Sequence, residues 1–155
     1  MSTTPFPRTV AFGSDDRTPL TDALLQAFRE RGYHTLRFGA VLDGSTNWPD
    51  IARSVGHAVA CGDASFGVVC CWTGTGVSIA ANKVPGVRAA LCCDAETAEG
   101  ARRWNDANVL ALSLRATSIP VALEILDAFV CSHASEDGGD REAIAAMELG
   151  AATVG

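Results

Sequence analysis

The sequence has few positive charges, and they form no basic run. Twelve Lys and Arg residues stand against 18 Asp and Glu residues, which gives a formal net charge of −6. Proteins that bind nucleic acid or anionic membrane surfaces depend on clustered Lys and Arg side chains. We therefore predict that neither nucleic acid nor a membrane is a partner of this protein.

Long hydrophobic runs are also missing. No apolar stretch approaches the roughly 18 residues of a candidate membrane span. The first residues, MSTTPFPRTVAFGS, lack the basic start and the apolar core of a signal peptide. A cytoplasmic location is therefore the expectation.

The usual ligand patterns of a metal site are absent as well. The six cysteines include no C-x-x-C pair, and the three histidines are scattered. We therefore predict no bound metal. The cysteines are expected to be mostly buried free thiols of a reducing compartment. Adjacent cysteines on a strand, such as Cys70 and Cys71, should point to opposite faces.

What the chain does contain is a regular alternation of short apolar segments and amphipathic ones over 155 residues. This predicts strands and helices in turn, which implies an α/β fold with a five-stranded parallel sheet covered on both faces. A single domain is expected over 1–155, with a polar linker at 135–140. The predicted strands are 8–13, 33–38, 66–72, 86–92 and 108–113. The predicted helices are 18–31, 49–61, 95–105, 118–130 and 141–150, and a Gly-rich turn that runs into a short helix is predicted over 74–82.

Ligands of such sheets bind beyond the carboxyl ends of the strands, so the segments that follow the strands are the candidate site. The most informative segment is 71–82, CWTGTGVSIAAN. Gly74 and Gly76 allow close backbone approach, and the following helix directs free N–H groups at the same loop. The loop is predicted to stabilise an anion. A dinucleotide fingerprint would need a third small residue at position 79, which is Ile79, so nucleotide binding is an alternative only.

The segment CWTGTGVSIAANKVPGVRAALC at 71–92, followed by RWNDANVLAL at 103–112, strongly resembles the ribose-5-phosphate isomerase B family. This family includes the galactose-6-phosphate isomerase subunits. AFGSDD at 11–16 and WPD at 48–50 also match in register. The resemblance implies a Rossmann-like three-layer α/β/α domain that forms dimers or tetramers, with active sites and the 138–155 helix at the subunit interface. It also implies interconversion of aldose and ketose phosphates through a cis-enediolate, without cofactors.

The resemblance implies roles for individual residues. Cys71 matches the catalytic base that moves a proton between C1 and C2, and Thr73 matches the hydroxyl beside it. Asp15 matches the family aspartate after the first strand. Asn105 would contact a sugar oxygen, Arg115 a phosphate, and the glycine loop the enediolate oxygen. The implied substrate-binding residues are Asp16, Trp48, Trp72, Gly74, Thr75, Gly76, Trp104, Asn105, Arg115 and Arg141.

Four departures from the family pattern point to a different substrate. Asp16 and Trp104 stand where the family has histidines, Trp72 stands where it has glycine, and Arg141 is the one basic residue where the C-terminal segment usually has two. An indole accepts no proton, so Trp104 cannot open a sugar ring. Trp72 fills space, and Asp16 repels a phosphate dianion. We therefore predict an aldose–ketose isomerase for a sugar phosphate or related α-hydroxy carbonyl compound other than ribose 5-phosphate.

Other interpretations stay open. The chain is alternatively a non-catalytic binding subunit, or one of two related chains that share sites. Trp72 and Trp104 are alternatively packed in the core, and Asp16 alternatively caps the helix that follows it. Arg115 and Arg141 are alternatively solvated surface charges.

Overall fold

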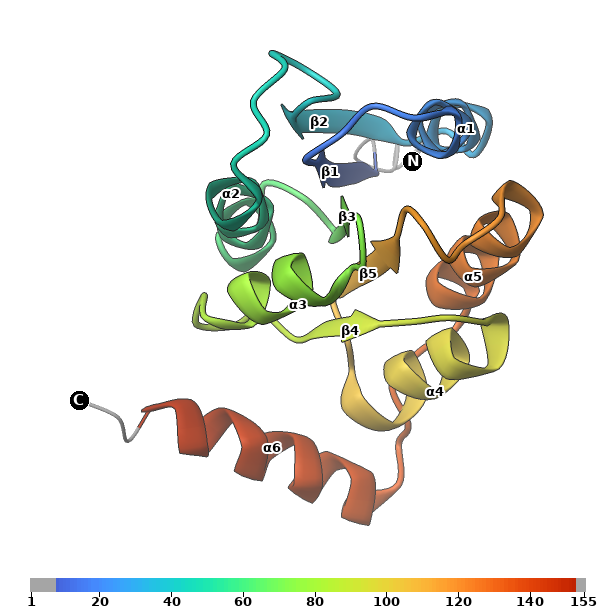
Figure 1. Ribbon diagram of the computed structural model, residues 1–155. Helices are drawn as coiled ribbons and strands as arrows, with labels where there is room; N and C mark the ends of the chain where they lie inside the picture. Colours follow the sequence, from blue (N-terminus) through green and yellow to red (C-terminus); the bar gives the residue numbers. More distant parts are fainter. Residues whose placement is uncertain (1–7, 153–155) are drawn as a thin grey trace, which may run out of the picture.

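The predicted strands form one parallel sheet. The computed structural model describes residues 8–152. Its strands are β1 (Thr9–Ser14), β2 (His34–Gly39), β3 (Phe66–Cys71), β4 (Ala89–Leu91) and β5 (Val109–Ser113). They lie in the order β2-β1-β3-β5-β4, and each neighbouring pair is parallel. The predicted five-stranded parallel sheet is confirmed (Figure 1).

Helices connect the strands and extend beyond the last one. They are α1 (Pro19–Glu30), α2 (Trp48–Ala60), α3 (Thr75–Asn82), α4 (Ala95–Asn105), α5 (Ile119–Cys131) and α6 (Gly138–Ala152). Several begin at side chains that accept a backbone N–H of the first turn, which is otherwise unpaired. Thr18 forms a capping box with Thr21 before α1, and Asp94 and Ser118 cap α4 and α5.

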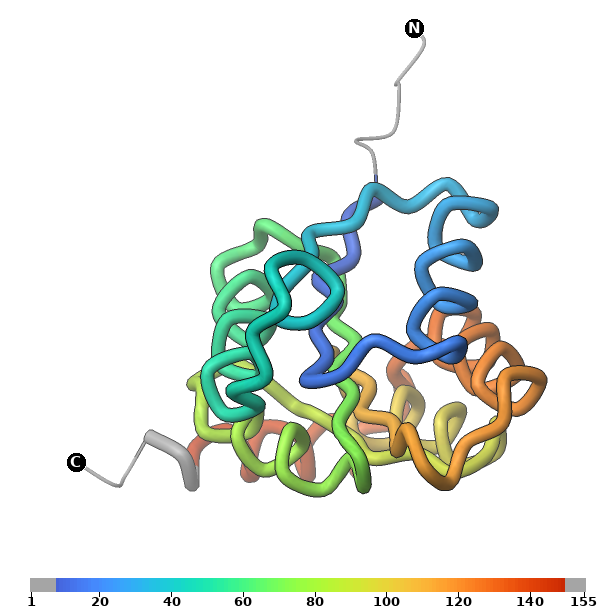
Figure 2. The backbone as a smooth tube through the Cα atoms, turned by 45° about the horizontal axis from the view of Figure 1, so that its top comes forward, coloured from blue at the N-terminus to red at the C-terminus, as the bar shows by residue number. Residues whose placement is uncertain are grey.

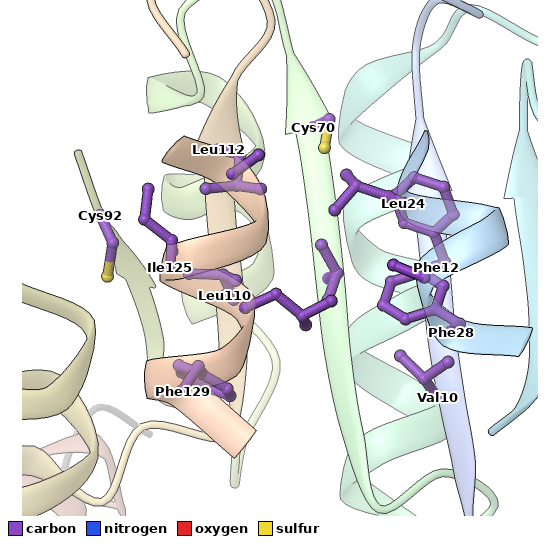
Figure 3. Close-up of a cluster of buried hydrophobic side chains, with 14 of the residues drawn as sticks. Val10, Phe12, Leu24, Phe28, Cys70, Cys92, Leu110, Leu112, Ile125 and Phe129 are labelled. Carbon is purple, nitrogen blue, oxygen red and sulfur yellow. The ribbon is translucent and has the colours of Figure 1, made fainter. Parts of the chain in front are cut away.

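Hydrophobic layers on the two faces of the sheet hold the helices in place. α1, α4 and α5 cover one face, whereas α2 and α3 cover the other. On the first face Phe12, Phe28 and Phe129 are buried (Figure 3). The rings of Phe12 and Phe28 meet edge to face, with centroids 5.3 Å apart. Burial of each such side chain contributes about 1.5–3 kcal/mol, so this layer is a main source of stability.

The adjacent cysteines of β3 lie on opposite faces of the sheet, because side chains alternate along a strand. Cys70 faces the layer of α1 and α5, where Figure 3 shows its sulfur among apolar side chains, and Cys71 faces the layer of α2 and α3. The prediction that adjacent cysteines point to opposite faces is confirmed. The expectation that most cysteines are buried is wrong, because Cys61, Cys93 and Cys131 lie at element ends and are exposed.

The fourth strand is shorter than predicted. It was expected over 86–92 but comprises only Ala89–Leu91. Gly86 has a φ of +85° and belongs to the turn that precedes the strand. Apolar residues such as Val87 are buried without being part of the sheet, which is why the apolar pattern overstates the length of the strand.

The last helix starts earlier than predicted, at Gly138 rather than at residue 141. The Asp137 carboxylate accepts the backbone N–H of Gly139 at 2.9 Å and supports the additional turn. Figures 1 and 2 show α6 beside the β4 edge of the sheet. Residues 153–155 of the predicted interface segment lie outside the described residues. Because Met147 and Leu149 are exposed, α6 presents apolar surface, and its place at a subunit interface stays a prediction.

Within residues 8–152 the structure contains neither a membrane-spanning helix nor a cluster of metal ligands. None of these helices is long and apolar enough to cross a bilayer. In the same range, no three His, Cys, Asp or Glu side chains gather closely enough to hold a metal ion.

Candidate functional site

The candidate site lies where the central strands end. Cys71 is the last residue of β3 and pairs with Ser113 of β5. On its other side Ser14 of β1 pairs with Cys70, so Asp15 follows β1 at the level of Cys71. The N–H of Asp15 donates to the carbonyl of Cys70 at 3.3 Å. The structure therefore places Cys71 and Asp15 side by side at the carboxyl edge of the sheet.

The loop between β3 and α3 depends on a glycine conformation. Gly74 has a φ of +75° and precedes the first turn of α3, with no side chain capping the helix. A Cβ at this position would lie 2.6 Å from Cδ1 of Leu91 and 2.8 Å from the carbonyl carbon of Leu112. Only glycine fits without displacing these atoms. The first N–H groups of α3 lack intrahelical acceptors and face the carboxyl edge, where they can stabilise an oxyanion.

Hydroxyl groups connect the loops around Cys71. The Oγ1 atoms of Thr73 and Thr75 are 2.7 Å apart, within hydrogen-bond distance. The Ser113 hydroxyl donates to the carbonyl of Trp72 at 2.9 Å and accepts the N–H of Ala116 at 3.1 Å. Ser113 thus ties the loop after β3 to the loop after β5. Ser113 is not among the predicted site residues, and its only signal in the sequence is a polar residue at the end of an apolar strand.

Two aspartates make this edge acidic. Burial raises the pKa of the Asp15 carboxyl, a backbone hydrogen bond opposes the rise, and the neighbouring Asp16 carboxylate adds to it. Asp16 is exposed, and its carboxylate accepts the N–H of Arg17 at 2.8 Å. Its carbonyl accepts the Ser14 hydroxyl at 2.6 Å. The alternative role of Asp16 as a helix cap is wrong, because Thr18 caps α1.

None of the three tryptophans lies in the core. The exposed fractions are 41% for Trp48, 62% for Trp72 and 58% for Trp104, so core packing is the wrong account of the latter two. Trp48 opens α2, and its indole lies over the first turn of α3. A Cβ added to Gly76 would be 3.1 Å from the indole carbons. Trp72 directly follows Cys71 and is exposed at the carboxyl edge.

Arg115 also lies at the carboxyl edge. It lines a cavity of about 270 Å³ together with Thr73, Cys92 and Cys93. Burial raises the pKa of the Cys92 thiol to about 12, which makes this thiol a poor nucleophile. The backbone N–H of Arg115 donates to the carbonyl of Trp72 at 3.0 Å. Arg115 thus brings a positive charge to a hollow that borders the loop after β3.

The remaining predicted residues lie at the other end of the sheet. Trp104 and Asn105 end α4 just before β5 begins, which places them at the amino edge. Asn105 lines a cavity of about 400 Å³ between β4 and α6. Arg141 lies on α6. The segment just before α6 is attached to the end of α4, because the backbone N–H of Ser135 donates to the carbonyl of Arg103 at 2.8 Å. One chain therefore does not bring Trp104, Asn105 or Arg141 to its own Cys71.

Comparison with known proteins supports the resemblance seen in the sequence. Residues 10–147 match the model of a family described as Ribose/Galactose Isomerase. The chain belongs to the Ribose/Galactose Isomerase family. Over 144 residues it is 37% identical to ribose-5-phosphate isomerase B of Escherichia coli, covering 90% of this chain and 95% of that one. Over 92 residues it is 41% identical to D-erythrulose-4-phosphate isomerase of Pectobacterium atrosepticum, covering 59% of each.

The solved structures of this family share the fold. Type B ribose 5-phosphate isomerase of Trypanosoma cruzi matches with a TM-score of 0.89 at 35% identity, covering 97% of this chain and 100% of that one. The Rossmann-like fold and the family resemblance are thereby confirmed. The roles of individual site residues, and their sharing between copies of the chain, stay predictions.

Proposed function

We propose that this protein is a divergent aldose–ketose isomerase that acts through a cis-enediolate. Its substrate is a sugar phosphate or a related α-hydroxy carbonyl compound other than ribose 5-phosphate. The observation that supports the proposal most is the junction of β3 and α3, where Cys71 ends the central strand next to the first turn of the helix. A proton acceptor and free N–H donors meet there, which are the two groups that enediolate chemistry needs.

The proposed reaction moves one proton and leaves the composition of the substrate unchanged. The Cys71 thiolate takes the proton from the carbon next to the carbonyl, and the electron pair of that C–H bond forms the enediolate. The N–H groups that follow Gly74 hold the negative oxygen. The thiol then returns the proton to the former carbonyl carbon. Asp15, whose pKa burial raises, and the Thr73 hydroxyl are suited to move a proton between the two substrate oxygens.

The surroundings favour a substrate with less negative charge and more apolar surface than a pentose phosphate. The carboxylates of Asp15 and Asp16 oppose a dianion at this edge. The indoles of Trp48 and Trp72 offer exposed apolar faces. One relative is named for erythrulose 4-phosphate, a four-carbon ketose phosphate with no ring to open. Such an open-chain compound does not require a proton acceptor at Trp104.

The proposal includes a homodimer, or a tetramer built from dimers. A second copy is needed because Trp104, Asn105 and Arg141 lie at the amino edge, away from the Cys71 of the same chain. An exposed apolar side chain lies near these residues, because Met147 on α6 lines the same cavity as Asn105. Light scattering should give about twice the chain mass of 16.1 kDa or more, and a species of 16 kDa alone would contradict the dimer. A related second subunit is the alternative partner.

Proton exchange tests the chemistry directly. Candidate compounds, including erythrulose 4-phosphate, ribose 5-phosphate and unphosphorylated hydroxy ketones, are incubated in D₂O and followed by NMR. The wild-type protein should place deuterium next to the carbonyl of at least one compound. Cys71→Ala should lower this rate by about 10²–10⁴, whereas Cys70→Ala, on the opposite face of the strand, should retain it. Absence of exchange with every compound would favour the non-catalytic alternative.

A further inference from the structure

The end of α4 has an unusual backbone conformation. Asp106 has a φ of +47°, and it is the only residue other than glycine with a positive φ in the described part of the chain. It is the C-terminal cap of α4 and directly follows Trp104 and Asn105. A residue with a side chain keeps this conformation only when its surroundings hold it. The contacts of Asp106 therefore determine where α4 ends.

Two arginines hold Asp106. The Nε of Arg88 donates to the Asp106 carbonyl at 2.7 Å, and its Nη2 donates to the carboxylate at 3.3 Å. The Nη1 of Arg102 donates to the other carboxylate oxygen at 3.4 Å. Arg88 is itself fixed, because its backbone N–H donates to the side chain of Asn108 at 2.7 Å and its carbonyl accepts the N–H of Asn108 at 2.9 Å. The half-buried guanidinium of Arg88 is thus held at a defined place.

The same guanidinium also reaches α6. Nη1 of Arg88 donates to Oε1 of Glu148 at 2.8 Å, and both residues line the cavity of about 400 Å³ that Asn105 also lines. A neighbouring hollow is shared by Asp106 and Arg141. Arg88 therefore joins the end of α4, which carries the tryptophan and the asparagine, to the helix that carries Arg141.

We propose that Arg88 is a positioning residue for the side chains that one copy of the chain donates to the site of a second copy. Its consequence for catalysis rests on the proposed function. Arg88 acts through Asp106 and Glu148, which its planar fork contacts together, and the single ammonium of a lysine cannot reproduce these contacts. The indole of Trp104 lies against Gly100 one turn earlier, where a Cβ would be 2.7 Å away, so the ring follows the end of α4.

Fluorine NMR tests the positioning without any catalysis. Labelling with 5-fluorotryptophan gives three resonances, one for each tryptophan, and Trp104→Phe identifies the relevant one. Arg88→Lys should shift or broaden the Trp104 resonance and leave Trp48 unchanged. Arg31→Lys is the matched control, because Arg31 forms a two-contact pair with Asp127, at 2.7 and 3.0 Å, between other helices. An unmoved Trp104 resonance in folded Arg88→Lys would overturn the proposal.

A variant on the other side of the network keeps the test decisive. Glu148→Gln retains the size of the side chain and removes its charge, so it weakens the contact of Arg88 with α6. It should move the Trp104 resonance in the same direction as Arg88→Lys but by less. If Arg88→Lys does not fold, an unchanged Trp104 resonance in Glu148→Gln would overturn the proposal instead.

Mixed dimers test the catalytic consequence. Arg88→Lys alone should lower kcat/KM by about 10- to 100-fold through misplacement of the donated side chains. Co-expression of Arg88→Lys with Cys71→Ala gives mixed dimers. One site of each mixed dimer combines the intact Cys71 of the first chain with side chains donated by the second chain, whose Arg88 is intact, so activity should return. No recovery would mean that Arg88 serves its own chain, and the proposal would be wrong. A mixture of Trp104→Ala with Cys71→Ala tests the shared site itself, so failure of that mixture refutes the proposed two-copy site instead.

Discussion

Replacing Gly74 with alanine should destabilise the protein more than the same change at Gly32. The two glycines have nearly equal φ angles, +75° at Gly74 and +77° at Gly32. Alanine in this left-handed conformation costs about 1–2 kcal/mol, and the cost should be the same at both positions. Their surroundings differ, because nothing lies within 4 Å of a Cβ added to Gly32, whereas three atoms lie within 3 Å of one added to Gly74.

The difference between the two variants measures the packing of the loop on β5. The three close atoms are at 2.6, 2.8 and 2.9 Å, and two of them belong to the backbone of Leu112 and Ser113. A strand in the interior of the sheet cannot retreat easily, and overpacking of this kind costs about 1–3 kcal/mol. Gly74→Ala should therefore lower the free energy of unfolding by about 2–5 kcal/mol in total. Relative to Gly32→Ala, its Tm should be lower by roughly 2–12 °C.

Urea and thermal unfolding of both variants, at one protein concentration, provide the measurement. A fixed concentration is needed because association of subunits contributes to the apparent stability. If the two alanine variants have the same free energy of unfolding within about 0.5 kcal/mol, the inference that the Gly74 loop packs tightly against β5 is refuted. Folded Gly74→Ala should also lose proton exchange, because the first turn of α3 must move to admit the new methyl group.

Two further substitutions and one labelling experiment test the environment of the site. Asp15→Asn should raise Tm more at about pH 7 than at about pH 3. Burial raises the pKa of the Asp15 carboxyl in the folded state, so the stability from this carboxyl is full below its unfolded pKa and is lost as pH rises through the folded value. Equal gains in Tm at the two pH values would contradict this. Gly76→Ala should displace the indole of Trp48 and change its quenching by acrylamide, and an unchanged response would refute the contact. Limiting iodoacetamide should label exposed Cys93 before Cys70, whose pKa burial raises, as read by mass spectrometry, and the reverse order would contradict the burial.

The fold class could be predicted from the sequence, and the candidate site could be proposed from it, because their signals are local. The apolar run that becomes β3, and the caps Thr18 and Ser118, involve residues that are close in the chain. The glycine loop that follows Cys71 marks the carboxyl edge of a parallel sheet, which is where ligands of such folds bind. These patterns predict which elements form and which loop belongs to the candidate site.

Only the tertiary structure decided which residues meet. Ser113 stands opposite Cys71 because of the register between β3 and β5, which no local pattern specifies. Arg88 contacts Glu148, 60 residues further along the chain, only after α6 has packed beside β4. Trp104 is separated from Cys71 because α4 starts at the carboxyl edge and returns to the amino edge. Such relations depend on how helices pack across the sheet, since contacts between distant residues leave no periodic trace in the sequence.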